Sequence, residues 1–219
     1  MTRDLDLGRF YDIIGVLEQR TGKRRLASCD GGMDWPSQGV YFFFEEGEVR
    51  AGGEPRVVRV GTHAVTAGSH TTLWNRLRMH RSGGHRGSIF RHHVGTALMR
   101  RDGLICPSWL SKHATAVPKA AEAHVETAVS RVIGSMPFLW VRAENPAGPT
   151  SIRGYLERNA IALLSNQGRE PIDPPSDGWL GRCCTNPKVR SSGLWNADHT
   201  DEQYVELFLD LLARLVQAQ

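Results

Sequence analysis

The sequence has no uninterrupted apolar stretch of the roughly 20 residues that a membrane helix needs. Its first residues include acidic side chains and no apolar segment, so we expect neither a membrane association nor a secretory signal. Its four cysteines lack CxxC spacing, which argues against a zinc ribbon or a disulfide framework. With 40% hydrophobic and 23% charged residues, the chain is expected to be a globular cytoplasmic protein.

One region of the chain lacks acidic residues altogether. Residues 56–101 contain nine of the 27 lysine and arginine residues, all of them arginine, and none of the 23 acidic residues. Solvated charged surfaces usually mix lysine with glutamate, whereas guanidinium groups bind phosphate through paired N–H donors. The first prediction is therefore a polyanionic partner, above all DNA. The alternative is a regulatory protein whose arginines bind an acidic protein.

Hydrophobic periodicity predicts one α/β domain with helical additions at both ends. Apolar residues at helical spacing predict an N-terminal helix over 4–20. Runs of β-branched and aromatic residues predict an antiparallel strand pair over 39–44 and 56–61. A Thr–Gln capping box predicts that the last helix begins at Thr200. The remaining predictions are a strand at 138–145 and helices at 72–81, 88–101, 119–136, 151–168 and 200–217.

Four short motifs follow one another along these elements, each of them uninformative alone. They are GVY at 39–41, RVG at 59–61, LWNRLRMH at 73–80 and YLERN at 155–159. In this order they resemble the GIY element, the YIG element, the arginine helix and the glutamate helix of the GIY-YIG nuclease family. The likeness extends over roughly residues 38–166.

The resemblance implies an α/β fold with a small three-stranded sheet, antiparallel or mixed, flanked by helices. On this basis we divide the chain into an N-terminal helical extension (1–37), a nuclease domain (38–168) and an irregular segment with a C-terminal helix that packs on the domain (169–219). The terminal segments suggest a homodimer as one possible assembly. The implied function is a DNA endonuclease that uses one divalent cation, Mg²⁺ or Mn²⁺, in restriction, defence or repair.

The resemblance also assigns roles to side chains. Glu157 would hold the cation, because hard cations prefer carboxylate oxygen. Arg76 would stabilise charge on the scissile phosphate. Tyr41 would act on the attacking water as base or positioner, and His80, one helical turn after Arg76, would relay a proton or hold the phosphate.

The sequence departs from the family pattern at two points. Arg59 occupies the position of the second motif tyrosine, so Arg59 or His63 would bind phosphate or orient water in its place. An asparagine commonly follows the glutamate in this family, and Asn166 and Asn196 are the candidates here. The side chains predicted to bind nucleic acid are His63, Arg78, Arg81, Arg86 and Arg91.

Each assignment has a structural alternative. Tyr41 could be a core aromatic beside three phenylalanines, and Arg76 and His80 could be surface residues. Glu157 shares an apolar helix stripe with Ile161, where a buried carboxylate needs a partner. That partner is either a metal ion or Arg153, four residues earlier. A His-based metal-finger nuclease around residues 92–93 and a zinc site using Cys106 have less support, and a non-catalytic nucleic-acid-binding module is the main functional alternative.

Overall fold

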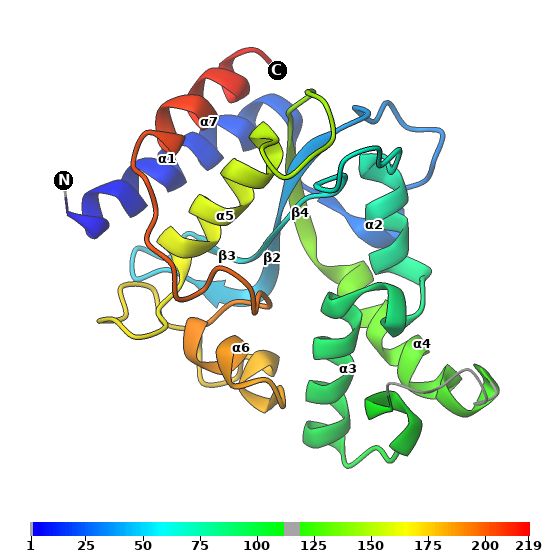
Figure 1. Cartoon of the computed structure of the whole chain (residues 1–219). Coiled ribbons are helices and arrows are strands. Elements are labelled where there is room, and N and C mark those ends of the chain that lie inside the picture. Colours follow the sequence, from blue (N-terminus) through cyan, green and yellow to red (C-terminus); the bar gives the residue numbers. More distant parts are fainter. Residues whose placement is uncertain (1, 112–118) are drawn as a thin grey trace.

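The computed structural model describes residues 2–111 and 119–219, and its centre is an open antiparallel sheet with strand order β1-β4-β2-β3 (Figure 1). The strands are β1 (Arg24–Arg25), β2 (Gly39–Val49), β3 (Pro55–Gly61) and β4 (Pro137–Arg142). The hairpin of β2 and β3 and the third strand, β4, are confirmed. All strand pairs in the sheet are antiparallel. The sheet has one strand more than expected, because the two residues of β1 pair with the edge of β4. Two residues are too few to produce a detectable alternation in the sequence.

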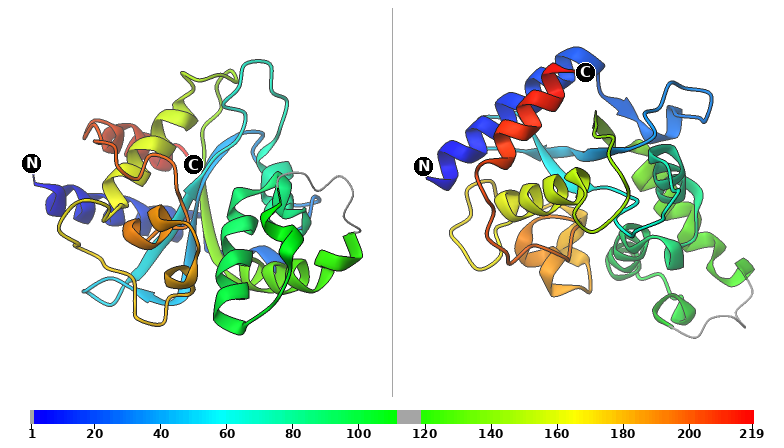
Figure 2. Two further views of the ribbon diagram at one scale, coloured as in Figure 1. Left: turned by 60° about the horizontal axis from the view of Figure 1, so that its bottom comes forward. Right: turned by 45° about the horizontal axis from the view of Figure 1, so that its top comes forward.

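Helices cover both faces of this sheet (Figure 1). One face packs against α1, α5 and α7, and the other packs against α2, α3 and α4. In Figure 2, α1 and α7, from opposite ends of the chain, lie side by side, and their residues are in contact. The helices are α1 (Arg3–Thr21), α2 (Leu73–Ser82), α3 (Ile89–Asp102), α4 (Lys119–Ser135), α5 (Ile152–Leu164), α6 (Pro187–Ser192) and α7 (Phe208–Gln217).

Successive side chains of β2 enter opposite cores, as the two-residue period of a strand requires. Val40, Phe42 and Phe44 pack toward α1 and α5, whereas Tyr41 and Phe43 pack toward α2 and α3. All five are at most 2% exposed. A strand that is buried on both faces has no polar alternation, which explains the continuous apolar run in the sequence. The same period places Tyr41 on the side of the sheet that carries the arginine-rich helices.

The three sequence segments share these two cores. Each core contains residues from 1–37, from 38–168 and from 169–219. Leu7 and Phe208 lie in one of them, and Leu26 and Trp195 lie in the other. The terminal segments therefore complete the hydrophobic layers on which the sheet is built.

The last helix begins at Phe208, and the prediction that it begins at Thr200 is wrong. Thr200 Oγ1 donates to Gln167 Oε1 at 2.7 Å, and its carbonyl accepts a hydrogen bond from Ser165 Oγ at 2.6 Å. These contacts fix Thr200 to the end of α5. Long-range hydrogen bonds have taken the place of the local capping box.

Gly95 does not interrupt α3, although glycine lowers helix propensity. The indole of Trp109 lies against it, and a Cβ atom at position 95 would be 2.1 Å from Trp109 Cζ2. The glycine gives the aromatic ring a place on the helix surface.

Candidate active site at the ends of β2 and β3

Tyr41 and Gly61 form the structural centre of the site. They are partners in the β2–β3 register, and the Tyr41 ring lies against the Gly61 backbone. A Cβ atom at position 61 would be 2.3 Å from Tyr41 Oη. Glycine is needed here because the aromatic ring occupies the space of a side chain. The GVY and RVG motifs thus form one packed unit.

His80 joins this unit from α2. Its Nε2 lies 2.7 Å from Tyr41 Oη, and its Nδ1 lies 2.8 Å from Ser88 Oγ. Tyr41 and His80 are both fully buried. Burial, reinforced by the positive charges of Arg59, Arg76 and Arg91, lowers the pKa of His80 well below its ordinary value. The imidazole is therefore neutral near pH 7, with one nitrogen as donor and the other as acceptor.

Arg59 occupies the place of the second motif tyrosine and is 4% exposed. Its Nη1 donates to the carbonyl of Trp195 at 2.9 Å, and its guanidinium lies 4.6 Å from the Phe90 ring centroid. Burial lowers the pKa of Arg59, while the neighbouring Tyr41 and Glu157 act to raise it. Arg59 thus brings a buried positive charge close to the Tyr41 hydroxyl and the Glu157 carboxylate.

Arg76 lies near Arg59 but has little to bind. Its Nη1 donates only a long hydrogen bond of 3.5 Å, to the carbonyl of Gly87. Its Nε and that of Arg59 are buried with no hydrogen-bond partner among the described residues. Buried donors are nearly always satisfied in native proteins. Two unsatisfied guanidinium nitrogens at one place indicate a site for an anion.

Glu157 reaches the same end of the sheet from α5. Its Oε1 accepts a hydrogen bond from the Thr62 amide at 3.1 Å, one residue beyond Gly61. Burial raises the pKa of this carboxyl, while Arg59 and the Thr62 amide act to lower it. The carboxylate lines a cavity of about 520 Å³ together with the first turn of α5 and His199. At this location, at the edge of a solvent-accessible space, a carboxylate oxygen of Glu157 could bind a cation.

Arg153 is not the partner of Glu157, so the salt-bridge interpretation of that carboxylate is wrong. Arg153 is fully buried, and its guanidinium donates to the carbonyls of Ala64, Ala143 and Asn145. These bonds tie the start of α5 to the chain beyond β3 and β4. Among the described residues, the Glu157 carboxylate has no salt-bridge partner.

A divalent cation fits this donor set only if most of its ligands are not protein side chains. Within residues 2–111 and 119–219, no group of three or more His, Cys, Asp and Glu side chains could hold a metal ion. One carboxylate with a free oxygen suits Mg²⁺, which keeps several waters and binds substrate phosphate. The same finding gives no support, in the described part of the chain, to the metal-finger or Cys106 zinc alternatives.

His63 lies beyond Gly61 and is 4% exposed. Its Nε2 lies 3.3 Å from the Ser37 carbonyl, which can only accept, so the proton is on Nε2. Burial lowers the pKa of His63 to about 4, with Arg153 and Arg76 contributing. The neutral ring keeps a lone pair on Nδ1, which is buried and has no partner among the residues described. His63 therefore offers a hydrogen-bond acceptor rather than a positive charge.

The two candidate asparagines have structural contacts. Asn196 Oδ1 accepts from the Val60 amide at 3.1 Å, and its Nδ2 donates to the Val60 carbonyl at 2.9 Å. Asn166 Nδ2 donates to the carbonyl of Asp173, and its Oδ1 accepts from Arg3. Asn196 extends the edge of β3, whereas Asn166 stabilises the turn after α5.

The predicted DNA-binding arginines differ in what they contact. Arg91 is 1% exposed and binds Glu126, so its burial argues against phosphate binding. Arg86 forms two hydrogen bonds with Glu122, at 2.6 and 2.7 Å. Arg81 donates to the carbonyl of Cys29. Only Arg78 of this group is exposed without a side-chain contact among the described residues.

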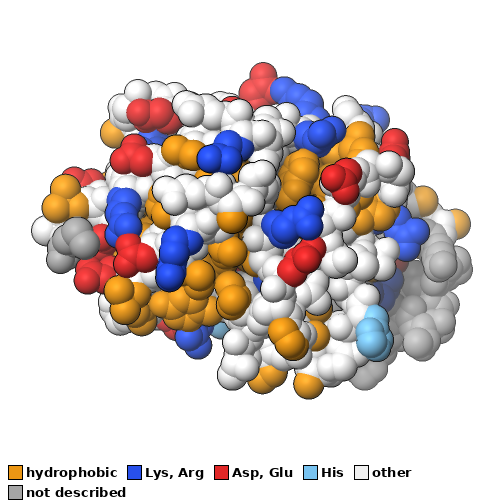
Figure 3. All heavy atoms as spheres, turned by 90° about the horizontal axis from the view of Figure 1, so that it is seen from above, with side chains coloured by type: hydrophobic (Ala, Val, Ile, Leu, Met, Phe, Trp, Pro, Cys, Tyr) orange, Lys and Arg blue, Asp and Glu red, His pale blue; other side chains and the backbone are white. Residues whose placement is uncertain are grey.

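The carboxylates that the sequence segment 56–101 lacks thus come from α4, at Glu122 and Glu126. On the face of the molecule shown in Figure 3, too, basic side chains alternate with acidic ones. Of the nine arginines in residues 56–101, four form ion pairs with carboxylates, namely Arg56, Arg86, Arg91 and Arg101. The other five form none among the described residues; they are Arg59, Arg76, Arg78, Arg81 and Arg100.

Sequence reasoning missed Thr62, whose amide binds Glu157, and Ser88, which contacts His80. Ser88 could have been found by its other role, since it caps α3 by accepting from the Arg91 amide. Thr62 acts through its backbone amide, which does not depend on the residue type, so the sequence cannot indicate this role.

A sequence model of the GIY-YIG domain matches this chain over residues 1–219. Searches of curated proteins and of solved structures found no match. Among the described residues, no helix is both long and apolar enough to cross a bilayer.

Proposed function

The chain belongs to the GIY-YIG domain family, and from this premise we propose that it is a divalent-metal-dependent endonuclease that hydrolyses phosphodiester bonds of DNA. The observation that carries the proposal is the contact of Tyr41 with His80 at 2.7 Å, beside Gly61 and close to two arginines with unsatisfied donors. The opposing carboxylate, Glu157, is bonded to the next residue of the same strand end. Hydrolysis of a phosphodiester needs these three functions: proton transfer, charge stabilisation and a metal ligand.

In the proposed reaction the arginines bind the scissile phosphate. The Nε–H groups of Arg59 and Arg76 donate to its oxygens and stabilise the charge that grows as the bond to the nucleophile forms. Because both donors are already buried, little reorganisation is needed when the charge develops. This preorganisation explains why two positive charges are kept near each other in the free protein.

Tyr41 and His80 act on the proton of the attacking water. The Tyr41 hydroxyl orients the water and takes its proton while passing its own to neutral His80, whose second nitrogen contacts Ser88. The lone pair on His63 Nδ1 offers a second acceptor, which could replace the missing second motif tyrosine in orienting the water. Glu157 would hold the cation, Mg²⁺ or Mn²⁺, which would polarise the phosphate and neutralise its charge.

A second candidate function is DNA binding without cleavage. The observation that favours it is the complete burial of Tyr41 and His80, together with arginine in place of the second tyrosine. The fold would then present phosphate-binding arginines without reaching a water molecule. A homodimeric assembly, a cytoplasmic location and a role in restriction or defence are predictions that accompany the first function.

Plasmid nicking separates the two functions. Supercoiled DNA is incubated with Mg²⁺ and the wild type, Glu157→Gln or Glu170→Gln, the last an exposed carboxylate outside the site. We expect nicking by the wild type and by Glu170→Gln, and a loss of at least about 10³-fold in Glu157→Gln. Retarded but intact DNA with all three proteins would refute the nuclease and support the binding module.

A further inference from the structure

His199 lies on the segment between β3-bound Asn196 and α7, and it lines the same cavity as Glu157. The two side chains are close enough to interact electrostatically, since His199 acts to lower the pKa of Glu157. The cavity also takes in Arg158 and the first turn of α5. An imidazole and a carboxylate therefore line one solvent-accessible space.

The backbone holds His199 in a defined position. Its φ is 63°, in the left-handed region that few non-glycine residues adopt. On one side, the Asn196 amide binds both backbone atoms of Val60 in β3. On the other side, Thr200 is bonded to Ser165 and Gln167 at the end of α5. The segment is thus anchored to the two elements that carry Arg59 and Glu157.

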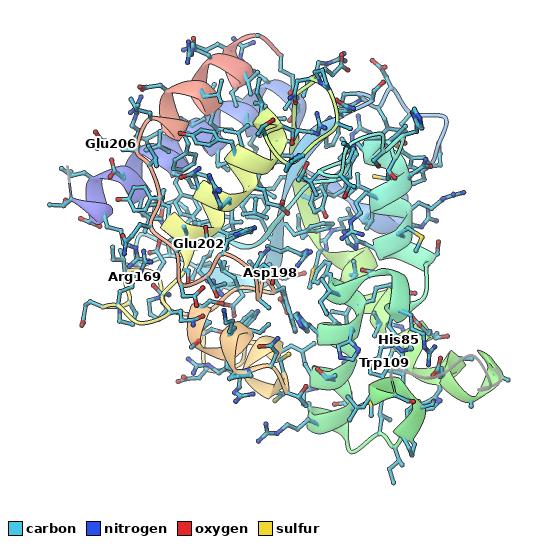
Figure 4. All side chains as sticks on the ribbon, in the orientation of Figure 1. His85, Trp109, Arg169, Asp198, Glu202 and Glu206 are labelled. Atoms are coloured by element: carbon cyan, nitrogen blue, oxygen red, sulfur yellow. The ribbon has the colours of Figure 1, made fainter. Side chains whose placement is uncertain are left out.

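Glu202 fixes the orientation and the tautomer of the ring. His199 Nδ1 lies 2.7 Å from Glu202 Oε1, and a carboxylate can only accept, so Nδ1 carries the proton. The carboxylate itself is 3.9 Å from Arg158 Nε, and the Glu202 carbonyl accepts from Arg169. In Figure 4, Glu202 lies beside α5. In its neutral form, an imidazole oriented in this way presents the Nε2 lone pair.

A histidine that donates Nδ1–H to a carboxylate and offers Nε2 is the usual form of a metal-binding imidazole, because the hydrogen bond sets the tautomer and raises the basicity of the ligand. The Nε2 atom of His199 makes no hydrogen bond within the part of the chain that the structure describes. We propose that His199 is a second protein ligand of the divalent cation held by Glu157, with Glu202 as the residue that positions it. This inference rests on the proposed function, because it requires Glu157 to hold a cation.

The choice of metal follows from the ligand. Oxygen ligands suit both Mg²⁺ and Mn²⁺, whereas imidazole is a ligand of transition metals. Of the two cations, Mn²⁺ therefore gains more from an imidazole. The full chain is therefore expected to bind Mn²⁺ more tightly than Mg²⁺. Replacing His199 by an oxygen ligand is expected to reduce this preference.

The test measures metal binding alone, without DNA or turnover, on full-length protein without a polyhistidine tag. Mn²⁺ and Mg²⁺ affinities are measured by titration calorimetry, and nitrogen coordination is detected by electron spin-echo modulation of bound Mn²⁺. The variants are His199→Asn, which tolerates the left-handed backbone, Glu202→Gln and Glu157→Gln. His124→Ala, an exposed histidine on α4, is the matched control, and circular dichroism confirms folding.

We expect His199→Asn to lose the ¹⁴N modulation and at least tenfold in Mn²⁺ affinity, with a smaller change for Mg²⁺. Glu202→Gln is expected to lose about 10-fold or more through its effect on the ring, and His124→Ala to match the wild type. If Glu157→Gln abolishes Mn²⁺ binding but His199→Asn keeps both affinity and modulation, the role of His199 is refuted and the nuclease proposal stands. If Glu157→Gln still binds Mn²⁺ like the wild type, the metal site of the proposed function fails as well.

Discussion

Two groups of arginines come from the same acid-free segment, residues 56–101. In the fold, one group has N–H donors with no hydrogen-bond partner in the described part of the chain, and the other is paired with carboxylates. Arg59 and Arg76, at the end of the β2–β3 hairpin, have buried Nε donors with no partner among the described residues. Arg86 and Arg91, on the α3 side, bind the carboxylates of Glu122 and Glu126 on α4. The first group keeps N–H donors without a partner within the described residues, whereas the second joins α4 to the segment before it.

The histidines repeat this division. His63 and His80, near the unpaired arginines, are neutral at pH 7 because burial and positive charge lower the pKa of each. His85, stacked on Trp109 with ring centroids 3.8 Å apart, binds Glu126 through Nδ1. Figure 4 shows this pair beside α4 and far from Asp198 and Glu202. Neither burial nor a missing partner identifies a functional site by itself here, because the buried His85 Nε2 also has no partner among the described residues.

Substituting one arginine from each group gives the largest contrast. Arg76→Ala is expected to lower the cleavage rate by about 10²–10³-fold, because it removes a preorganised donor to the transition state, and to leave the midpoint of thermal unfolding nearly unchanged. Cleavage is followed on supercoiled plasmid, and unfolding by differential scanning calorimetry. A loss of stability as large as the loss of activity would show that Arg76 is structural.

Arg91→Ala should show the reverse pattern. It leaves Glu126 without its buried arginine partner, and breaking such a pair costs about 3 kcal/mol, or roughly 6–12 °C for a chain of this size. DNA cleavage per folded molecule should stay within about a few fold of the wild type at a temperature where both are folded. Arg101→Ala, in the exposed pair with Asp102, serves as the control and should not change the unfolding midpoint. If Arg91→Ala were as stable as the wild type but did not cleave DNA, Arg91 would be functional rather than structural, and the two groups of arginines would not differ in role.

Acid should destabilise the protein through the buried neutral histidines. His63 and His93 each have a pKa lowered to about 4 by burial, whereas in the unfolded chain the value is near 6.5. The unfolded state therefore binds more protons as pH falls from 6.5 toward 4, and stability decreases over this window. The full effect is about 3 kcal/mol for each histidine.

Urea unfolding at pH 7.5, 6 and 5 measures this dependence. The slope should become shallower in His63→Gln and remain that of the wild type in His124→Gln, whose side chain is exposed. Equal slopes in all three proteins would mean that His63 is not held neutral by the fold.

The sequence predicted the secondary-structure elements that carry the candidate site residues. It did not predict the contacts that these residues make with residues far away in the chain. The apolar runs and the helical periodicity predicted the two strands of the hairpin and the helices that carry Arg76 and Glu157 correctly, because each strand or helix is a property of one continuous segment. The pairing of Arg91 with Glu126 spans 35 residues, and the Thr62–Glu157 bond uses a backbone amide 95 residues away. His199 depends on Asn196 and Thr200, which the sequence presented as an irregular segment and a helix cap.

The smallest expected effect is on DNA affinity, and it should differ between the exposed arginines Arg78 and Arg86. Arg78→Ala removes an exposed charge with no side-chain partner among the described residues, so DNA affinity should fall a few fold and the slope of log K against log salt by about one. Arg86→Ala should change this slope less, because Glu122 already neutralises that guanidinium. Binding is measured by fluorescence anisotropy in the Glu157→Gln background, where the DNA stays intact. If Arg86→Ala changed the slope as much as Arg78→Ala, Arg86 would have to leave Glu122 for a phosphate, and the pairing seen in the free protein would not predict which arginines bind DNA.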